Sequence, residues 1–141
     1  MKPTQTLGLA LASLFSYQSM ATELCIEVDN IQTLQGTIRT VVVDSKAGFD
    51  GEAKPAGAFV VPASQSSLSV CIDGFAEGEY ALRVMQDVDG DEELATNLIG
   101  APAEPWGTSN NAKGSFGPPK WKQARFELKG ERVIQNITLN N

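Results

Sequence analysis

An acidic run in the middle of the chain holds the side chains with the clearest capacity for chemistry. Five carboxylates fall within seven residues, namely Asp87, Asp89, Asp91, Glu92 and Glu93. Neighbouring carboxylates repel one another, so such a run is stabilised by full solvation, by nearby lysine or arginine, or by a bound cation. The D-x-D-x-D spacing is the one that wraps oxygen ligands around calcium.

The run does not fit an EF-hand, which requires glycine at the sixth position of its loop and a bidentate glutamate at the twelfth. Here those positions hold Glu92 and Leu98, and the ninth position is Ala95. A looser calcium loop remains, and the alternative is a solvated acidic turn. The candidate metal ligands are Asp87, Asp89, Asp91, Glu93 and Asn97.

The chain contains no histidine, which limits the classes of enzyme to which it could belong. This absence excludes Ser-His-Asp and Cys-His catalysis and leaves zinc and copper poorly supplied with ligands. A carboxylate-dependent hydrolase is an alternative function, although no spacing singles out an acid and a base. We therefore expect a binding or structural protein rather than an enzyme.

Aromatic and amide side chains that follow the acidic run form a second candidate site. They suit the stacking and hydrogen bonding of a carbohydrate or a peptide. The alternative is that the tryptophans pin a long loop to the rest of the domain. These candidate ligand-binding residues are Trp106, Asn110, Asn111 and Trp121.

Short β segments must position both sites. Alternating or β-branched runs, separated by Gly, Pro and Asp, predict about seven strands and an all-β, single-domain sandwich of the immunoglobulin-like or transthyretin-like kind. Gly130-Glu131 predicts a hairpin between the last two strands. Residues 89–122 lack a long strand but contain both tryptophans, so we expect one long ordered loop there. The expected strands are 24–29, 36–44, 58–61, 67–73, 79–87, 124–129 and 133–139.

The two cysteines lie in two of these expected strands. Aliphatic residues flank Cys25 and Cys71 at alternating positions, so both thiols are expected on the less apolar strand face. If the two strands are neighbours, a cross-strand disulfide joins Cys25 and Cys71. The alternative is two free thiols.

The first residues resemble an export signal, with Lys2, an apolar stretch at 7–15 and small residues at 19–21. The alternative is a buried N-terminal helix. We expect residues 1–21 to be removed, which leaves a domain of residues 22–141 in the periplasm or outside the cell. Without Lys2, 10 basic residues face 17 acidic ones, a net charge of −7. That charge disfavours nucleic acid and anionic membranes as partners. No membrane span is expected, and a cell-envelope glycan or protein is the candidate partner.

The stretch from Gly78 to Phe126 resembles a bacterial exported family, domain-of-unknown-function family 2141. The family pattern runs G-x-Y-A, H-D-x-N-x-N-G-x-L-D-x-N, G-x-P-x-E and G-x-S-N-N. Matching residues are Gly78, Tyr80, Ala81, Asp87, Asp89, Asp91, Leu94, Asn97, Gly100, Pro102, Glu104, Gly107, Ser109, Asn110, Asn111, Phe116 to Pro119, Ala124 and Phe126.

Three positions depart from the family pattern. Gln86 stands where the family often has histidine, Glu92 replaces a usual glycine and Ala95 replaces a usual aspartate. The loss of the aspartate weakens the inference of a metal site from the family. The resemblance implies a secreted sandwich fold and no established activity.

Overall fold

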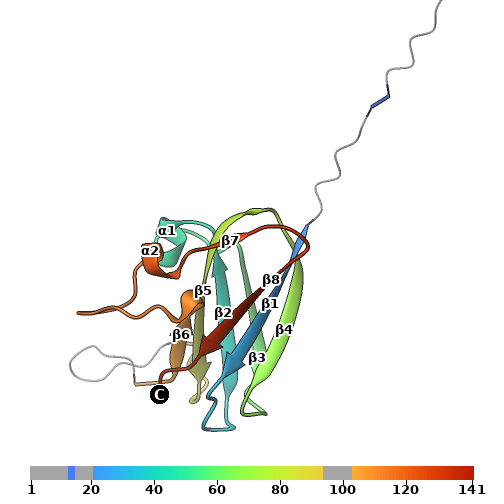
Figure 1. Ribbon diagram of the computed structural model, residues 1–141. Coiled ribbons are helices and arrows are strands. Elements are labelled where there is room, and N and C mark those ends of the chain that lie inside the picture. Colours follow the sequence, from blue (N-terminus) through green and yellow to red (C-terminus); the bar gives the residue numbers. More distant parts are fainter. Residues whose placement is uncertain (1–12, 15–20, 94–102) are drawn as a thin grey trace, which may run out of the picture.

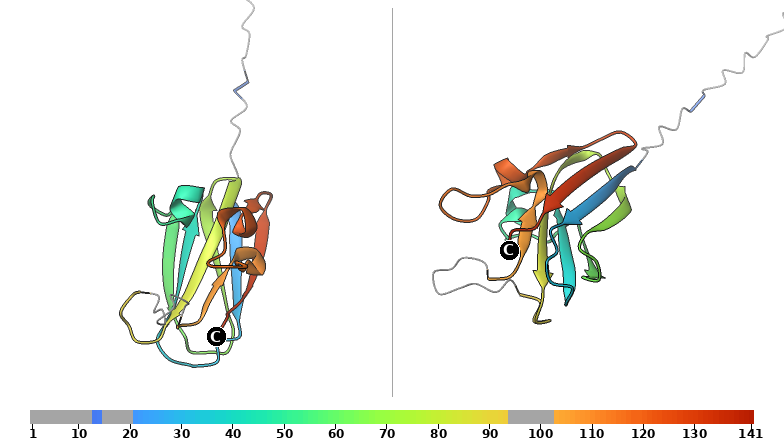
Figure 2. Two further views of the ribbon diagram at one scale, coloured as in Figure 1. Left: turned by 90° about the vertical axis from the view of Figure 1, so that its left-hand side faces the viewer. Right: turned by 60° about the horizontal axis from the view of Figure 1, so that its bottom comes forward.

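The computed structural model describes residues 13–14, 21–93 and 103–141. The last two ranges form an all-β sandwich of two sheets (Figures 1 and 2). One sheet has three strands in the order β4-β1-β8. The other has five, with β3-β2-β5-β6 as its main path and β7 also paired with β5. The strands are β1 (Thr22–Asp29), β2 (Thr37–Val43), β3 (Gly57–Pro62), β4 (Leu68–Phe75), β5 (Gly78–Asp87), β6 (Trp106–Thr108), β7 (Phe126–Leu128) and β8 (Arg132–Thr138).

The core lies between the two sheets and follows the alternation of the sequence. Leu24, Ile26 and Val28 of β1 face inward and are at most 1% exposed. Leu82 and Val84 of β5 meet them from the opposite sheet and belong to the same apolar cluster. Burial of each such side chain contributes about 1.5–3 kcal/mol, so this layer supplies most of the driving force for the sandwich.

Cys25 and Cys71 form a disulfide with an S–S distance of 2.07 Å. The two residues are direct partners in the antiparallel pairing of β1 with β4. The predicted bridge is therefore confirmed. It lies on the outer face of the small sheet because the neighbouring Leu24 and Ile26 occupy the core face.

Two features of the chain path differ from the sequence prediction. The structure has eight strands rather than seven, because the three-residue β6 lies within the segment expected to be a loop. The predicted hairpin at Gly130-Glu131 is wrong. β7 pairs with β5, whereas β8 runs parallel to β1 in the other sheet, so this turn carries the chain from one sheet to the other.

Short helices cover one end of the sandwich. Helix α1 (Lys46–Phe49) begins at Ser45, whose hydroxyl accepts a hydrogen bond from the Gly48 N–H at 3.0 Å. Helix α2 (Trp121–Ala124) includes Ala124, which was expected to begin a strand. Both helices lie at the end of the sandwich away from the C-terminus (Figure 1). Among the described residues, no helix is long and apolar enough to cross a membrane.

Candidate functional site

The acidic residues gather where β5 ends and β6 begins. Asp87 is the last residue of β5, and it is paired with Thr37 of β2. The chain returns through Glu104, two residues before β6. The Gln86 N–H donates to the Pro105 carbonyl at 2.8 Å, which fixes the returning segment beside the end of β5. The sheet therefore holds two acidic segments that are separated in sequence.

Four carboxylates converge at this point. Asp87, Asp89, Asp91 and Glu104 each offer one oxygen, and these oxygens all lie within 4.8 Å of one another. Two oxygens bound to a single calcium ion, each at 2.3–2.6 Å from it, are separated by at most about 5 Å. The spacing of the four oxygens therefore fits a common cation.

Asp87 is the buried anchor of the cluster, at 1% exposure. Its Oδ1 accepts from the Gly90 N–H at 2.9 Å and its Oδ2 from the Glu92 N–H at 3.0 Å. Arg39 Nε also donates to Oδ2, at 3.1 Å. Burial alone raises the pKa of Asp87, but these hydrogen bonds and the Arg39 charge outweigh it, and the net pKa lies below the ordinary value.

Asp89 and Asp91 sit at the exposed side of the cluster. Each carboxylate accepts a hydrogen bond from the backbone N–H two residues on, at 3.2 Å for Asp89 and 2.9 Å for Asp91. The Asp91 N–H lowers the pKa of Asp89. Desolvation and the carboxylates of Asp91 and Glu104 outweigh that effect, so the net pKa of Asp89 is raised. At Asp89, therefore, the backbone N–H donor does not offset the repulsion from the neighbouring carboxylates.

Arg39 of β2 is the counter-ion of the site. Its guanidinium reaches Asp87 through Nε and Glu92 through Nη2, the latter at 3.0 Å. Glu92 adopts a left-handed backbone conformation with φ of 65°, and its N–H donates to Asp87. Among the described residues, Arg39 thus pairs with two of the carboxylates gathered at this end of β5, Asp87 and Glu92.

We expect opposite pH effects from the two perturbed aspartates. The stabilisation by Asp87 is complete above the ordinary carboxyl pKa of about 3.9 and is lost as pH falls through its lower folded-state value. Asp89, with its raised pKa, instead favours the folded state when protonated, and that contribution disappears as pH rises through its folded-state value.

Urea unfolding between neutral and acidic pH, in the absence of divalent metal, measures both effects. Asp87→Asn should destabilise the protein at pH 7 and make its stability less sensitive to acid. Asp89→Asn should leave stability at pH 7 unchanged or raised. Asp73→Asn, an exposed acid on β4, is the control for loss of one charge. Equal losses at pH 7 in the Asp87 and Asp89 variants would contradict the assignment.

Trp106 and the acidic cluster share the outer face of the large sheet. Residues paired across strands lie on one face. The register places Arg39 opposite Val60 of β3 and Met85 of β5, and Met85 opposite Trp106. A row of aliphatic, cationic and aromatic side chains therefore crosses the sheet beside Asp87, and Val60 is 48% exposed.

Trp121 belongs to a different part of that face. Its ring packs edge-on against Phe49 of α1, with centroids 6.2 Å apart. The Arg83 guanidinium lies over the Phe49 ring, 5.9 Å from the ring centroid. Trp121 and Phe49 join a small apolar cluster that attaches both short helices to the sheet. Trp121 therefore attaches the long segment to the domain, which is the structural role that the sequence analysis gave as the alternative for the tryptophans.

The two asparagines lie in the short helix η1 (Ser109–Asn111), which contacts β8 of the small sheet and β5 of the large sheet. Asn110 Nδ2 donates to the carbonyls of Gln123 (3.1 Å) and Arg125 (2.9 Å). Asn111 accepts from the Thr138 N–H at 2.8 Å and donates to the Asn136 carbonyl at 3.3 Å. These amides connect η1 to the backbone around α2 and to β8, so the two side chains have a structural role.

Ser109 and Gly107 are the other matching residues of the G-x-S-N-N motif, and both have structural roles. The buried Ser109 hydroxyl accepts from the Leu82 N–H at 2.9 Å and donates to the Ala124 carbonyl at 2.5 Å. A Cβ on Gly107 would stand 2.6 Å from Ile137 Cγ2 of β8. A buried hydroxyl and a residue without a side chain are therefore needed where the sheets approach each other.

The structure brings together only some of the metal ligands that the sequence predicts. Carboxylate oxygens of Asp87, Asp89 and Asp91 lie close together. The Glu93 carboxylate is not among the four that meet, and Asn97 falls within 94–102, outside the described residues. Glu104 was missed as a ligand, although the G-x-P-x-E element of the resemblance pointed to it.

Gln86, which replaces a frequent histidine of the family pattern, has a structural role. Its fully buried side chain donates through Nε2 to the carbonyls of Thr33 (2.6 Å) and Gln35 (2.8 Å). These bonds attach the β1–β2 connection to β5 next to Asp87. The residue supports the base of the acidic site from the core side.

The fold and the site define a class of protein: a two-sheet β-sandwich with an acidic loop between two strands of its larger sheet. The family model described as an uncharacterized protein conserved in bacteria, DUF2141, matches residues 26–136. The chain belongs to this family. No curated protein and no solved structure matches the chain.

Proposed function

We propose that this protein is an exported binding module whose acidic loop holds a calcium ion at the edge of an exposed sheet face. The observation that carries the proposal is the convergence of Asp87, Asp89, Asp91 and Glu104 within 4.8 Å. The disulfide supports export, because such bonds persist in oxidising compartments.

The donor set favours calcium over other metals. All the donors are carboxylate oxygens, the chain contains no histidine, and its cysteines are joined in the disulfide. Calcium accepts six to eight oxygen ligands in flexible geometry, whereas magnesium demands a near-ideal octahedron. Carboxylates brought from a turn and from a separate returning segment suit the more tolerant ion. Bound calcium would offset the repulsion between the carboxylates of Asp89 and Asp91.

Thermal unfolding with EDTA, calcium or magnesium tests the proposal. A ligand that binds only the folded state stabilises it by about 1.4 kcal/mol at ten times its Kd. For a domain of this size the expected rise in Tm is about 5 °C. Calcium should produce this rise, and magnesium should produce less.

Variants locate the effect. Asp89→Asn and Glu104→Gln should each abolish the calcium-dependent rise, and Asp73→Asn should preserve it. Glu93→Gln tests which carboxylates hold the ion. If the four converging carboxylates hold it, this variant should keep the calcium-dependent rise in Tm. If the ligands predicted from the sequence hold it, the variant should lose the rise, because that set includes Glu93. The absence of any rise in the unaltered protein at millimolar calcium would refute the metal site and leave a solvated acidic turn.

A second candidate function is carbohydrate or peptide binding on the same sheet face. The half-buried Trp106 favours it, since this residue continues a row with Met85 and Arg39 across the strands. Its partner would be a cell-envelope glycan or protein. Such binding would change tryptophan fluorescence when the glycan or peptide is added, and calcium alone would not.

A further inference from the structure

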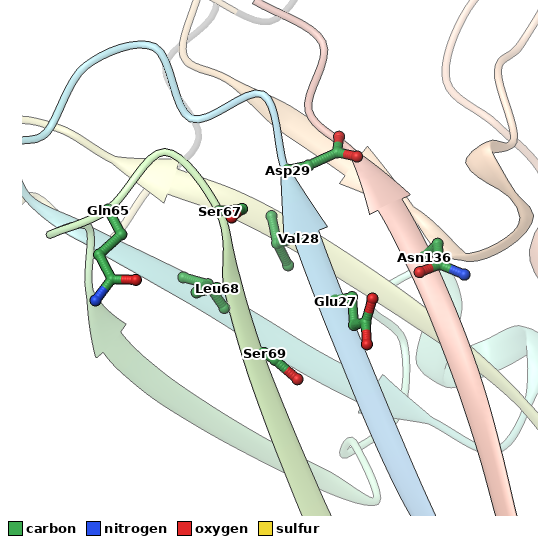
Figure 3. A pocket seen from close by; sticks show the side chains of 8 residues that line it. All are labelled: Glu27, Val28, Asp29, Gln65, Ser67, Leu68, Ser69 and Asn136. Atoms are coloured by element: carbon green, nitrogen blue, oxygen red, sulfur yellow. The ribbon is translucent and has the colours of Figure 1, made fainter.

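A polar groove lies on the small sheet, far in the sequence from the acidic loop. It has a volume of about 540 Å³ and opens on the outer face of β4, β1 and β8 (Figure 3). That volume is within the range of small-molecule sites, about 300–1,000 Å³. Six polar residues line it: Glu27, Asp29, Gln65, Ser67, Ser69 and Asn136.

The strand register places these side chains in rows. Glu27 of β1 is opposite Ser69 of β4 and Asn136 of β8, so the three side chains form one row across the sheet. Asp29 is two residues further along β1 and lies on the same face. Figure 3 shows its carboxylate at the end of the strand, beyond the Glu27 row. Two carboxylates, a hydroxyl and an amide are thus presented in one groove.

Apolar surface borders the polar row. Along β1 the next outward residue is Cys25, whose disulfide to Cys71 spans the two strands. Ile134 of β8 is the partner of Cys25 on the other side and is 50% exposed. The apolar residues that line the groove itself are Val28 and Leu68. The disulfide and Ile134 lie outside the groove, next to the Glu27 row on the same sheet face.

The groove's charges have no partners within the described part of the chain. Neither Glu27 nor Asp29 forms an ion pair, and no lysine or arginine is among the lining residues. Glu23, on the same face, is by contrast paired with Arg132. Ser69 and Asn136 line the groove beside Glu27. The groove thus offers negative charge and hydrogen-bond acceptors to a ligand.

We propose that this groove binds a small organic cation, in which a primary ammonium group is attached to a hydroxylated or aliphatic carbon frame. The ammonium would lie between Glu27 and Asp29, with Ser69 and Asn136 bonding its substituents. The carbon frame would extend over the disulfide and Ile134. Amino sugars and polyamines both carry this chemistry. The inference does not depend on calcium binding at the acidic loop.

Amide NMR titrations with glucosamine and with spermidine, in EDTA, test the proposal. Glucose and N-acetylglucosamine are the neutral comparators. An ammonium ligand should produce saturable shifts at residues 27–29, 65–69 and 136 and bind at least tenfold more tightly than glucose or N-acetylglucosamine. Tighter binding of glucosamine would assign an amino sugar, and tighter binding of spermidine would assign a polyamine.

Three variants separate the groove from general attraction to an acidic protein. The double variant Glu27→Gln with Asp29→Asn should raise Kd at least tenfold, equivalent to about 1.4 kcal/mol. Glu27→Lys, which supplies its own ammonium group, should abolish binding. Asp73→Asn removes an acid from the same sheet outside the groove and should change Kd less than twofold. Undiminished binding in the double variant, equal binding of neutral sugars, or shifts confined to residues 87–93 would overturn the proposal.

Discussion

Loss of the Cys25–Cys71 disulfide is expected to lower the free energy of unfolding by about 4 kcal/mol, because the bond closes a loop with a sequence separation of 46 residues. The loop contains β2, α1 and β3, so the unfolded chain loses much freedom when it is closed. For a domain of this size the corresponding fall in Tm is about 15 °C. Unfolding of Cys25→Ala with Cys71→Ala, compared with the unaltered protein, measures it.

The reduced, unaltered protein is the matched control for that double variant. Reduction breaks the bond but keeps both sulfur atoms, whereas alanine also removes the nearly buried Cys25 side chain, which is 4% exposed. Loss of the cross-link should account for most of the change, so the two proteins should unfold at similar urea concentrations. A loss below about 1 kcal/mol after reduction would show that the unfolded chain is not appreciably constrained by the bond.

Gly36→Ala is expected to destabilise the protein by about 3 kcal/mol. Gly36 has a φ of +72°, and alanine in a left-handed conformation costs about 1–2 kcal/mol. A Cβ there would also stand 2.0 Å from the Asp87 carbonyl oxygen, so the backbone at the base of the acidic loop must move. Overpacking of this kind adds about 1–3 kcal/mol. Urea unfolding at neutral pH measures the sum.

Gly51→Ala separates the two causes. Gly51 has a φ of +81°, but no atom lies within 4 Å of a Cβ placed on it. This variant should therefore lose only the conformational part, about 1–2 kcal/mol. Equal losses in the two variants would show that the contact between Gly36 and Asp87 carries no energetic weight.

The strands could be predicted because their burial is encoded locally. In β1 and β5 every second side chain enters the core, and that alternation is visible in the sequence. The three-residue β6 carries no such signal, since it exists only through its pairing with Met85 and its neighbours. The error at Gly130 has the same origin: a glycine turn is visible locally, but the sheet that receives the next strand is not.

The acidic site was partly predictable for a similar reason. Asp87, Asp89 and Asp91 are close because they are close in sequence. Glu104 joins them only because β6 returns beside β5, and Arg39 only because β2 is the neighbour on the other side. Contacts set by sheet order need the tertiary structure, and no local spacing reveals them.

The η1 turn has a consequence for how copies of this protein can associate. A strand at the border of a sheet normally exposes unpaired backbone groups that recruit another strand. On β8, the Asn111 amide occupies two such groups, the Thr138 N–H and the Asn136 carbonyl. Growth of the three-stranded sheet into a polymer is therefore obstructed on the β8 side. Within the described residues, strand addition to this sheet is left to its opposite border, β4.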